Sequence, residues 1–503
     1  MGSKLVTIAA LSLTVKGIAQ DGGATVTVHW DQVTGVSKTT VSIHNCVEPP
    51  MRRGSPIHDQ LFKALRDMKA DYARFQTWHP YPKLAVAELD PPKDGKTSWD
   101  FSLMDPLVAD FFEASEGRPV MLNLSTIPEW MFKTDKPVSY PADPDEIARH
   151  YSFGNTLRDP TLAEVAGYFK RLVGWYTKGG FNDEYGKWHE SGHHYKVAYF
   201  EVLNEVDFPS EHGLSPKQYT DIYDAVVSEL RKLDPEMKFS GLALAGRTTE
   251  QPDYFEYFLN PRNHKPGIPL DMISYHFYAT PARDETNEVQ QRSFFYMADK
   301  FLIAVRYIQA IRNRLSPHTL IYLNEVGSFT ADRMNLDIPL SYWTLSGSMF
   351  AYLFAHFAEI GVDLVAGSEL IDYPGQPVGA TLVDWRTGKP NARYWVLKLL
   401  RDNFGPGDKL VNTEMGRGQM DPAGPGGAQY ALVRGFISPA GDRKILLVNE
   451  RDRKIRISIR GITGAQVHYV DQSTGFEHPA SAELAEDAIE LKPQAVAVAR
   501  LSK

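Results

Sequence analysis

Short apolar runs rich in β-forming residues alternate with longer amphipathic stretches from about residue 39 to 400. Eight runs have this character: 39–45, 70–76, 119–125, 197–204, 237–245, 271–278, 319–326 and 363–370. Apolar residues recur with the helical period in the stretches between them, such as 56–68, 161–176, 215–233, 294–315 and 338–360. Eight strands joined by helical crossovers predict a (β/α)8 TIM barrel, an α/β fold, with insertions. A doubly wound sheet is the alternative, but no glycine-rich phosphate-binding turn follows the first run.

The pattern changes after Arg401, where turn-rich segments lead into short alternating strands. Their spacing is typical of a small antiparallel β-sandwich. The strand-like segment 25–31 precedes the barrel, and we expect it to pair with this C-terminal sheet. The sequence therefore predicts four regions: a leader over 1–19, an N-terminal strand region over 20–38, a catalytic barrel over 39–404 and an accessory sandwich over 405–503.

The first nineteen residues have the pattern of a secretory signal. Lys4 precedes an apolar run over 5–15, and Gly17 and Ala19 supply the small residues before a cleavage point. That run is too short to span a bilayer, which takes about 20 apolar residues. If the leader is a signal peptide, we expect a secreted or periplasmic bacterial protein.

Charge and cysteine content argue against a nucleic-acid-binding protein and against a small disulfide-stapled fold. The chain has 54 basic and 62 acidic residues, a formal net charge of −8, which argues against a nucleic-acid partner. Cys46 is the only cysteine, so no disulfide can form within the chain. We interpret Cys46 as a packed thiol, since no His-linked motif accompanies it.

Two Asn-Glu pairs end apolar strands at matching places in the predicted barrel. Asn204-Glu205 ends the fourth strand and Asn324-Glu325 ends the seventh. The C-terminal ends of barrel strands gather around one mouth, where the loops form the active site. Opposed carboxylates at such a mouth are what glycoside hydrolysis requires, because one protonates the leaving oxygen and the other attacks the anomeric carbon.

This arrangement resembles the large retaining clan of (β/α)8 glycosidases. Within that clan, the segments FEVLNEVDF, KFSGLALAG, SYHFY, LNEVGSF and GATLVDWRTGKPNARYWVLKLL are similar to glycoside hydrolase family 39, which includes β-xylosidases and α-L-iduronidases. Many members have Trp-Asn-Glu-Pro at the acid/base, where this chain has Leu203-Asn204-Glu205-Val206. The resemblance implies that Glu205 is the general acid/base and Glu325 the nucleophile. It also implies that Asn204 hydrogen-bonds the sugar hydroxyl beside the anomeric carbon.

Further residues near the strand ends are candidate helpers. His276 and Tyr278 share one face of the sixth strand and are expected to orient the carboxylates. Arg74, near the end of the second strand, is expected to keep Glu325 ionised by charge pairing. Additional candidates for substrate binding or packing lie near strand ends or in the following loops: Trp78, His79, Asn123, Glu129, Trp130, Trp343 and Glu369.

One metal motif is rejected. The segment 189–193 reads HESGH and matches the zinc-protease pattern, which requires a helix to place both histidines on one face. The surrounding residues have two glycines and no helical period, so we interpret the segment as a solvated loop.

The resulting prediction is a retaining, exo-acting, β-xylosidase-like glycosidase. Its expected partner is an oligosaccharide or glycoside, with no nucleic acid and no membrane span, and the chemistry needs no metal or organic cofactor. The sandwich is a candidate surface for a homo-oligomer. An endo-acting glycanase and an inactive carbohydrate-binding barrel are the alternatives, and the sequence does not identify the sugar.

Overall fold

The computed structural model describes residues 24–134, 137–148, 156–208, 212–246, 252–416 and 431–501. The leader over 1–19 and the turn-rich segment 421–427 lie outside these ranges. None of the helices within them has the length and apolar character needed to cross a membrane.

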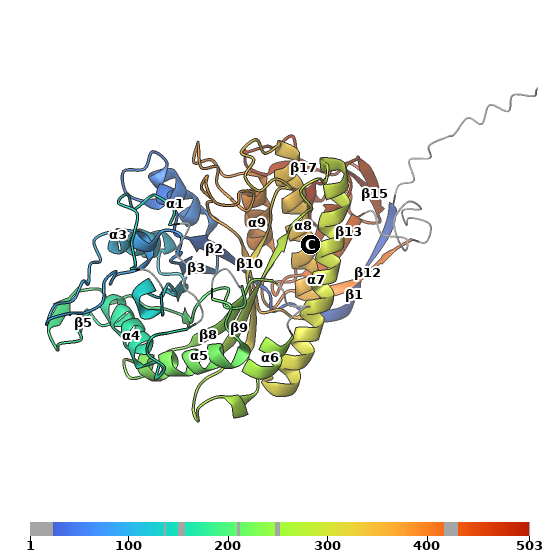
Figure 1. Ribbon diagram of the computed structural model, residues 1–503. Coiled ribbons are helices and arrows are strands. Elements are labelled where there is room, and N and C mark those ends of the chain that lie inside the picture. The colour runs from blue at the N-terminus through green and yellow to red at the C-terminus, as the bar shows by residue number, and fades with distance from the viewer. Residues whose placement is uncertain are drawn as a thin grey trace, which may run out of the picture.

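The eight expected strands form a closed parallel barrel in the order β10-β11-β2-β3-β4-β7-β8-β9, which confirms the predicted TIM barrel (Figure 1). Neighbouring strands pair in parallel all the way round. The strand bounds are β2 (Thr40–Cys46), β3 (Tyr72–Gln76), β4 (Val120–Asn123), β7 (Tyr199–Glu201), β8 (Phe239–Leu244), β9 (Met272–Ala279), β10 (Leu320–Ser328) and β11 (Leu364–Gly367).

Helices surround the barrel and cover its apolar outer face. Their bounds are α1 (His58–Met68), α2 (Pro82–Ala85), α3 (Met104–Ser115), α4 (Ala163–Thr177), α5 (Pro216–Leu230), α6 (Asp253–Phe258), α7 (Asn287–Leu315), α8 (Leu340–Ile360) and α9 (Ala392–Asn403). Local sequence fixes several helix starts. At α5, the Ser215 and Gln218 side chains form a capping box that satisfies backbone N–H groups of the first turn.

The HESGH segment is not helical and is accessible to solvent, as expected, but part of it forms a strand instead of a loop. Its first residues form β6 (Trp188–Glu190), which pairs antiparallel with β5 (Gly180–Asn182) in a hairpin. His189 Nε2 lies 2.8 Å from Asp183 Oδ2, and the ring of His193 stacks on Tyr176. The two histidines therefore have separate structural partners.

A second, mostly antiparallel sheet lies against the barrel; its nine strands within the described ranges run in the order β17-β16-β19-β14-β13-β12-β1-β15-β18. The bounds are β1 (Ala24–Val36), β12 (Lys409–Met415), β13 (Ala431–Ile437), β14 (Arg443–Asn449), β15 (Ile455–Ile459), β16 (Gln466–Val470), β17 (Ala480–Glu483), β18 (Ala488–Leu491) and β19 (Val496–Arg500). β1 pairs with β12 and β15, so the N-terminal strand joins the C-terminal sheet as predicted.

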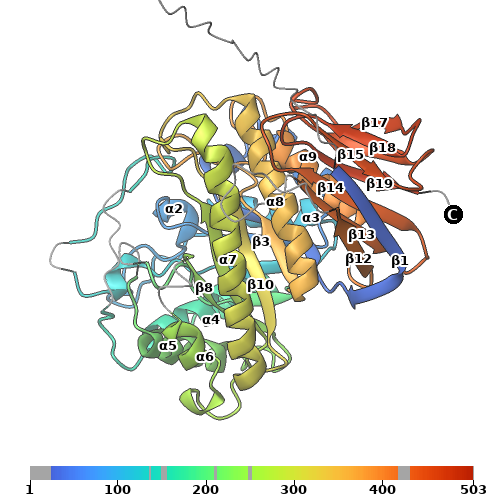
Figure 2. The ribbon, with the colours of Figure 1, turned by 90° about the vertical axis from the view of Figure 1, so that its right-hand side faces the viewer.

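The sheet folds over on itself and also packs against the barrel helices. Val26, Leu447 and Ile457, from β1, β14 and β15, share one apolar cluster inside the sandwich. Leu446 and Val498 point the other way and belong to the main core, next to α8 and α9. Figure 2 shows this sheet beside α8 and α9, away from α7.

Candidate active site

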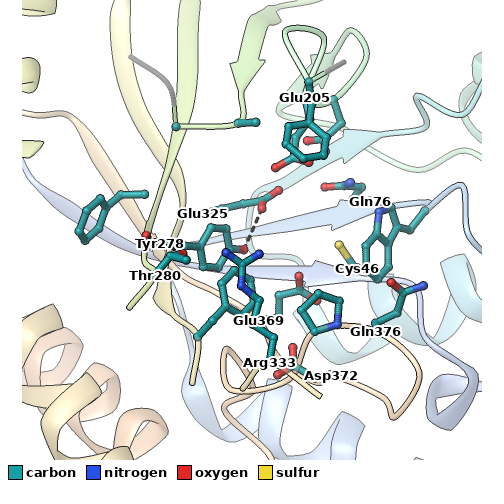
Figure 3. Close-up of a pocket in the computed structure, with 18 of the residues that line it drawn as sticks. Cys46, Gln76, Glu205, Tyr278, Thr280, Glu325, Arg333, Glu369, Asp372 and Gln376 are labelled. Carbon is teal, nitrogen blue, oxygen red and sulfur yellow. Dashed lines mark hydrogen bonds between the residues drawn. The ribbon is translucent and has the colours of Figure 1, made fainter. Parts of the chain in front are cut away.

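A cavity of about 550 Å³ opens at the C-terminal ends of the barrel strands (Figure 3). This size is usual for a small-molecule site. Both predicted catalytic carboxylates, Glu205 and Glu325, lie on its wall. Other lining residues include Cys46, Glu48, Gln76, Trp78, Asn204, Phe208, Tyr278, Phe329, Arg333, Glu369, Asp372 and Gln376.

A strained turn after β7 presents Glu205. β7 ends at Glu201, and the next residues include Leu203 and Glu205 with φ of 62° and 45°. Positive φ is costly for residues with a side chain and persists where the surroundings enforce it. Here the Glu205 N–H donates to the Ala243 carbonyl at 2.8 Å, which ties the turn to β8. The Glu205 side chain is 21% exposed and faces the cavity.

Glu325 belongs to β10 and is far more buried, with its side chain 5% exposed. Its Oε1 accepts a hydrogen bond from Arg74 Nη1 at 2.7 Å, and its Oε2 accepts one from the Tyr278 hydroxyl at 2.8 Å. Burial opposes the charge, but His276, His44 and Arg74 outweigh it and lower the pKa of Glu325. The side chain is therefore held as a carboxylate.

The two acidic groups lie close together around His276. One oxygen of Glu205, one oxygen of Glu325 and a ring nitrogen of His276 all lie within 4.8 Å of one another. His276 Nδ1 is 3.0 Å from Glu205 Oε1 and 3.3 Å from Glu325 Oε2. Burial lowers the pKa of His276, but both carboxylates raise it, and the net shift is upward. Carboxyl groups about 5–5.5 Å apart suit direct attack, whereas a pair that must admit a water is about 6.5–9.5 Å apart.

Arg74 connects Glu325 to a second buried carboxylate, Glu201. Arg74 donates to Glu201 at 2.6 Å, to Gln76 Oε1 at 2.7 Å and to Asn204 Oδ1 at 2.7 Å. Burial works against the charge on Arg74, but Glu201 and Glu325 raise its pKa. The Arg74 bond occupies the Asn204 oxygen, so the Asn204 amide nitrogen is the group that can donate to a ligand.

Glu201 was not predicted from the sequence. It lies one layer below the cavity, where Ser274 Oγ donates to it at 2.6 Å and Asn123 Nδ2 at 2.6 Å. Burial raises its pKa, but Arg74 and these hydrogen bonds bring the net shift below the ordinary value. A charged residue inside the apolar run VAYFEVLN is the signal that could have found it.

In the described part of the chain, two groups of side chains bring potential metal-binding atoms close together. One group is Glu205, His276 and Glu325, and the other is His44, Cys46 and Glu369. Arg74 lies beside both groups. Arg74 Nη1 is 2.8 Å from His44 Nδ1. A metal-bound histidine normally donates its other ring N–H to an acceptor. If His44 Nε2 bound a metal ion, Nδ1 would instead face the Arg74 guanidinium, which is itself a donor. We assign no metal to either group.

The structure separates the remaining predicted residues into three sets. Trp78, Tyr278 and Glu369 line the cavity, together with Asn204. Arg74 and His276 are fully buried and act through the carboxylates that they contact. The Cys46 thiol also reaches the cavity wall, and burial raises its pKa, in line with a packed thiol.

The third set does not line the cavity, and for these residues the structure shows the packing that the sequence left open. Asn123 is buried below it and bonds Glu201 and the Leu203 carbonyl. Trp130 Nε1 donates to the Glu88 carbonyl, and Arg158 covers its ring at 4.3 Å. Three more predicted residues are absent from the cavity wall: His79, Glu129 and Trp343. Burial lowers the pKa of His79 to about 3, and Trp343 packs in α8 beside Tyr342.

Replacing Arg74 by methionine is expected to cost about 3–5 kcal/mol of unfolding free energy, because Glu201 and Glu325 lose their buried cation. The pKa of Glu325, which Arg74 helps to lower, should rise. When the solution is acidified, activity that depends on ionised Glu325 would then be lost at a higher pH in the variant than in the wild type. Chemical unfolding and the acid limb of kcat/KM against pH measure the two effects. An unchanged acid limb in a folded variant would contradict this role.

No family model matches this chain, and no curated protein matches it in sequence. Solved structures do match it. They include an α-L-arabinofuranosidase from Thermotoga maritima (16% identity, TM-score 0.61, covering 95% of this chain and 99% of that one). A family 51 α-L-arabinofuranosidase from Bifidobacterium longum has 12% identity and a TM-score of 0.64, and the match covers 95% of this chain and 99% of that one. A GH30 endoxylanase from Clostridium papyrosolvens has 13% identity and a TM-score of 0.55, with 95% and 100% covered. The chain thus has the fold of these glycosidase structures, with a barrel and an accessory β-domain.

Proposed function

We propose that this protein is a retaining glycoside hydrolase in which Glu325 is the nucleophile and Glu205 the general acid/base. One observation carries the proposal: an oxygen of buried Glu325, whose pKa is lowered, and an oxygen of the more exposed Glu205 lie within 4.8 Å of each other in a cavity at the barrel mouth. The fold shared with arabinofuranosidases, xylanases and a glucosidase supports it.

The side chains suit a double displacement. In the first step, a Glu325 oxygen forms a bond to the anomeric carbon while Glu205 gives its proton to the glycosidic oxygen, and the aglycone leaves as an alcohol. In the second step, Glu205, now a carboxylate, takes a proton from water. The water oxygen attacks the anomeric carbon, and Glu325 leaves as a carboxylate. His276, beside both carboxylates, and Tyr278, bonded to Glu325, hold the pair in position.

Within this class we propose exo action of the β-xylosidase type and membership of family 39. The sequence segments quoted above support the family. Polar groups suited to holding a terminal sugar line the cavity: Glu369 and Asp372 lie on the loop after β11, and buried Glu48 follows β2. A terminal sugar would fit against these groups. The inactive alternative is less favoured, because Glu205 lines the cavity and contacts His276, which also contacts Glu325.

The test is a panel of aryl β-D-xylosides, α-L-arabinofuranosides and β-D-glucosides, with the first-formed anomer followed by NMR. We expect release of one terminal sugar with retention of configuration. Inversion would contradict the assigned nucleophile. A sugar that raises the melting temperature without any hydrolysis of the panel would favour a binding protein.

A further inference from the structure

An apolar stripe runs along the exposed face of α7. Val289, Tyr296, Ile303 and Tyr307 are 50%, 59%, 67% and 51% exposed. Three of them follow each other at seven-residue intervals, and exposed Ala310 continues the repeat. The solvent face of a surface helix is normally polar, so a row of large exposed apolar side chains two turns apart is a candidate interaction site.

Charged residues border this stripe on both sides. Arg292, Asp299 and Arg306 repeat every seven residues along one border, and all three are exposed. Lys300 and Arg314 lie along the other border, with Tyr307 between them in the same repeat. Figure 2 shows α7 along the outside of the barrel, with its stripe-bearing length not covered by the nine-stranded sheet.

We propose that this face of α7 docks against the same face of a second copy of the chain, with the two helices antiparallel. A two-fold axis at Ile303, the most exposed residue of the stripe, brings the two Ile303 side chains together. The same register sets the large Tyr296 ring against the small Ala310 of the second copy. Large-to-small pairing of this kind lets apolar side chains interdigitate.

One border is self-complementary in this register. In an antiparallel two-fold pair, each border row lies opposite the same row of the second helix. Asp299 therefore meets Arg306 of the second copy, and the symmetry gives this pair twice. On the other side, Lys300 Nζ lies over the Tyr296 ring of its own chain, 4.4 Å from the ring centre, and so stays with the stripe of its own helix. Two ion pairs, formed by Asp299 carboxylates that also accept from the Tyr352 hydroxyl, then flank the apolar centre, which commits the surface to a second copy.

The dimer should be weak. Residues 292–314 span about 33 Å of helix, at about 1.5 Å per residue. A strip of that length and one helix in width is at the small end of specific interfaces, where weak and transient complexes are found. The proposal does not depend on glycosidase activity. The opposite face of α7 packs on the barrel, where Phe301 stacks on Phe277 at 4.5 Å between ring centres.

Sedimentation velocity of the full chain across the micromolar range tests the proposal. We expect the wild type to shift from monomer to dimer, and Ile303→Glu to stay monomeric at least tenfold higher in concentration. Val36→Glu is the matched control, because Val36 is 55% exposed on β1, away from α7. A monomeric wild type, or equal effects of the two variants, overturns the proposal. A monomer that sediments with phosphatidylglycerol vesicles would overturn it in favour of a lipid surface.

A second measurement tests the register without depending on a charge change. Ile303→Cys should form a disulfide-linked dimer on mild oxidation, because the two substituted positions meet at the axis. Tyr296→Cys, on the same stripe, should crosslink at least several-fold more slowly, because it faces Ala310. Native Cys46 is buried and should not contribute. Faster crosslinking of Tyr296→Cys would overturn the register.

Discussion

Replacing Glu325 by alanine should lower turnover by at least about 10⁴-fold on every glycoside that the enzyme accepts. A nucleophile that forms a covalent intermediate cannot be replaced by a neighbouring group, and removing one from an enzyme costs several orders of magnitude. Glu325 is the acidic side chain best prepared for this role, because Arg74 and Tyr278 bind its two oxygens and lower the energy of the ionised form. Steady-state kinetics with the best aryl glycoside measure the loss.

Two controls separate chemistry from folding in this experiment. Arg74 keeps its bonds to Glu201 and Asn204 in the alanine variant, so the protein should remain folded by circular dichroism. Gln376→Ala is the matched variant, since Gln376 lines the same cavity but has no acidic group. Turnover of folded Glu325→Ala within tenfold of the Gln376→Ala value would remove Glu325 from the mechanism.

The barrel and the two carboxylates could be predicted because each leaves a local signal. Apolar runs of strand length and helical repeats mark the α/β units, and the parallel barrel brings their C-terminal ends together. Glu205 follows one such run and Glu325 lies near the C-terminal end of another, so the topology alone places them at one mouth. Pairing of the segment 25–31 with the C-terminal sheet could be predicted because an unpaired strand leaves backbone groups unsatisfied.

The layer beneath the site could not be predicted, because it depends on which side chains point inward and how deep they lie. Asn123 ends β4 and was expected to reach the substrate, yet its amide is used below the cavity by Glu201. The charge of Glu201 is balanced by Arg74, which lies on a strand 127 residues earlier in the chain. The positive φ of Leu203 and Glu205 likewise has no sequence signal, since neither residue is glycine.

Replacing Glu205 by alanine should produce a loss of activity that depends on the leaving group. Positioned general acids contribute about 10²–10⁴-fold, and the first step needs that proton only when the aglycone is a poor leaving group. Glycosides of simple alcohols should therefore lose about 10³-fold or more in kcat/KM. Activated nitrophenyl glycosides should lose much less in kcat/KM, because their phenolates leave without protonation. A series of aryl glycosides with graded phenol pKa values measures this dependence as a slope.

The second step supplies an independent test of the same residue. Water needs Glu205 as a base to attack the glycosyl-enzyme, but azide is already an anion and needs none. Azide should therefore accelerate turnover of activated substrates by Glu205→Ala and give a glycosyl azide, while leaving the wild type nearly unchanged. Asn204→Ala is the neighbouring control, because it changes the cavity beside Glu205 but keeps the acid/base, and azide should not rescue it. Equal losses across all leaving groups, together with no azide effect, would show that Glu205 carries no proton in either step.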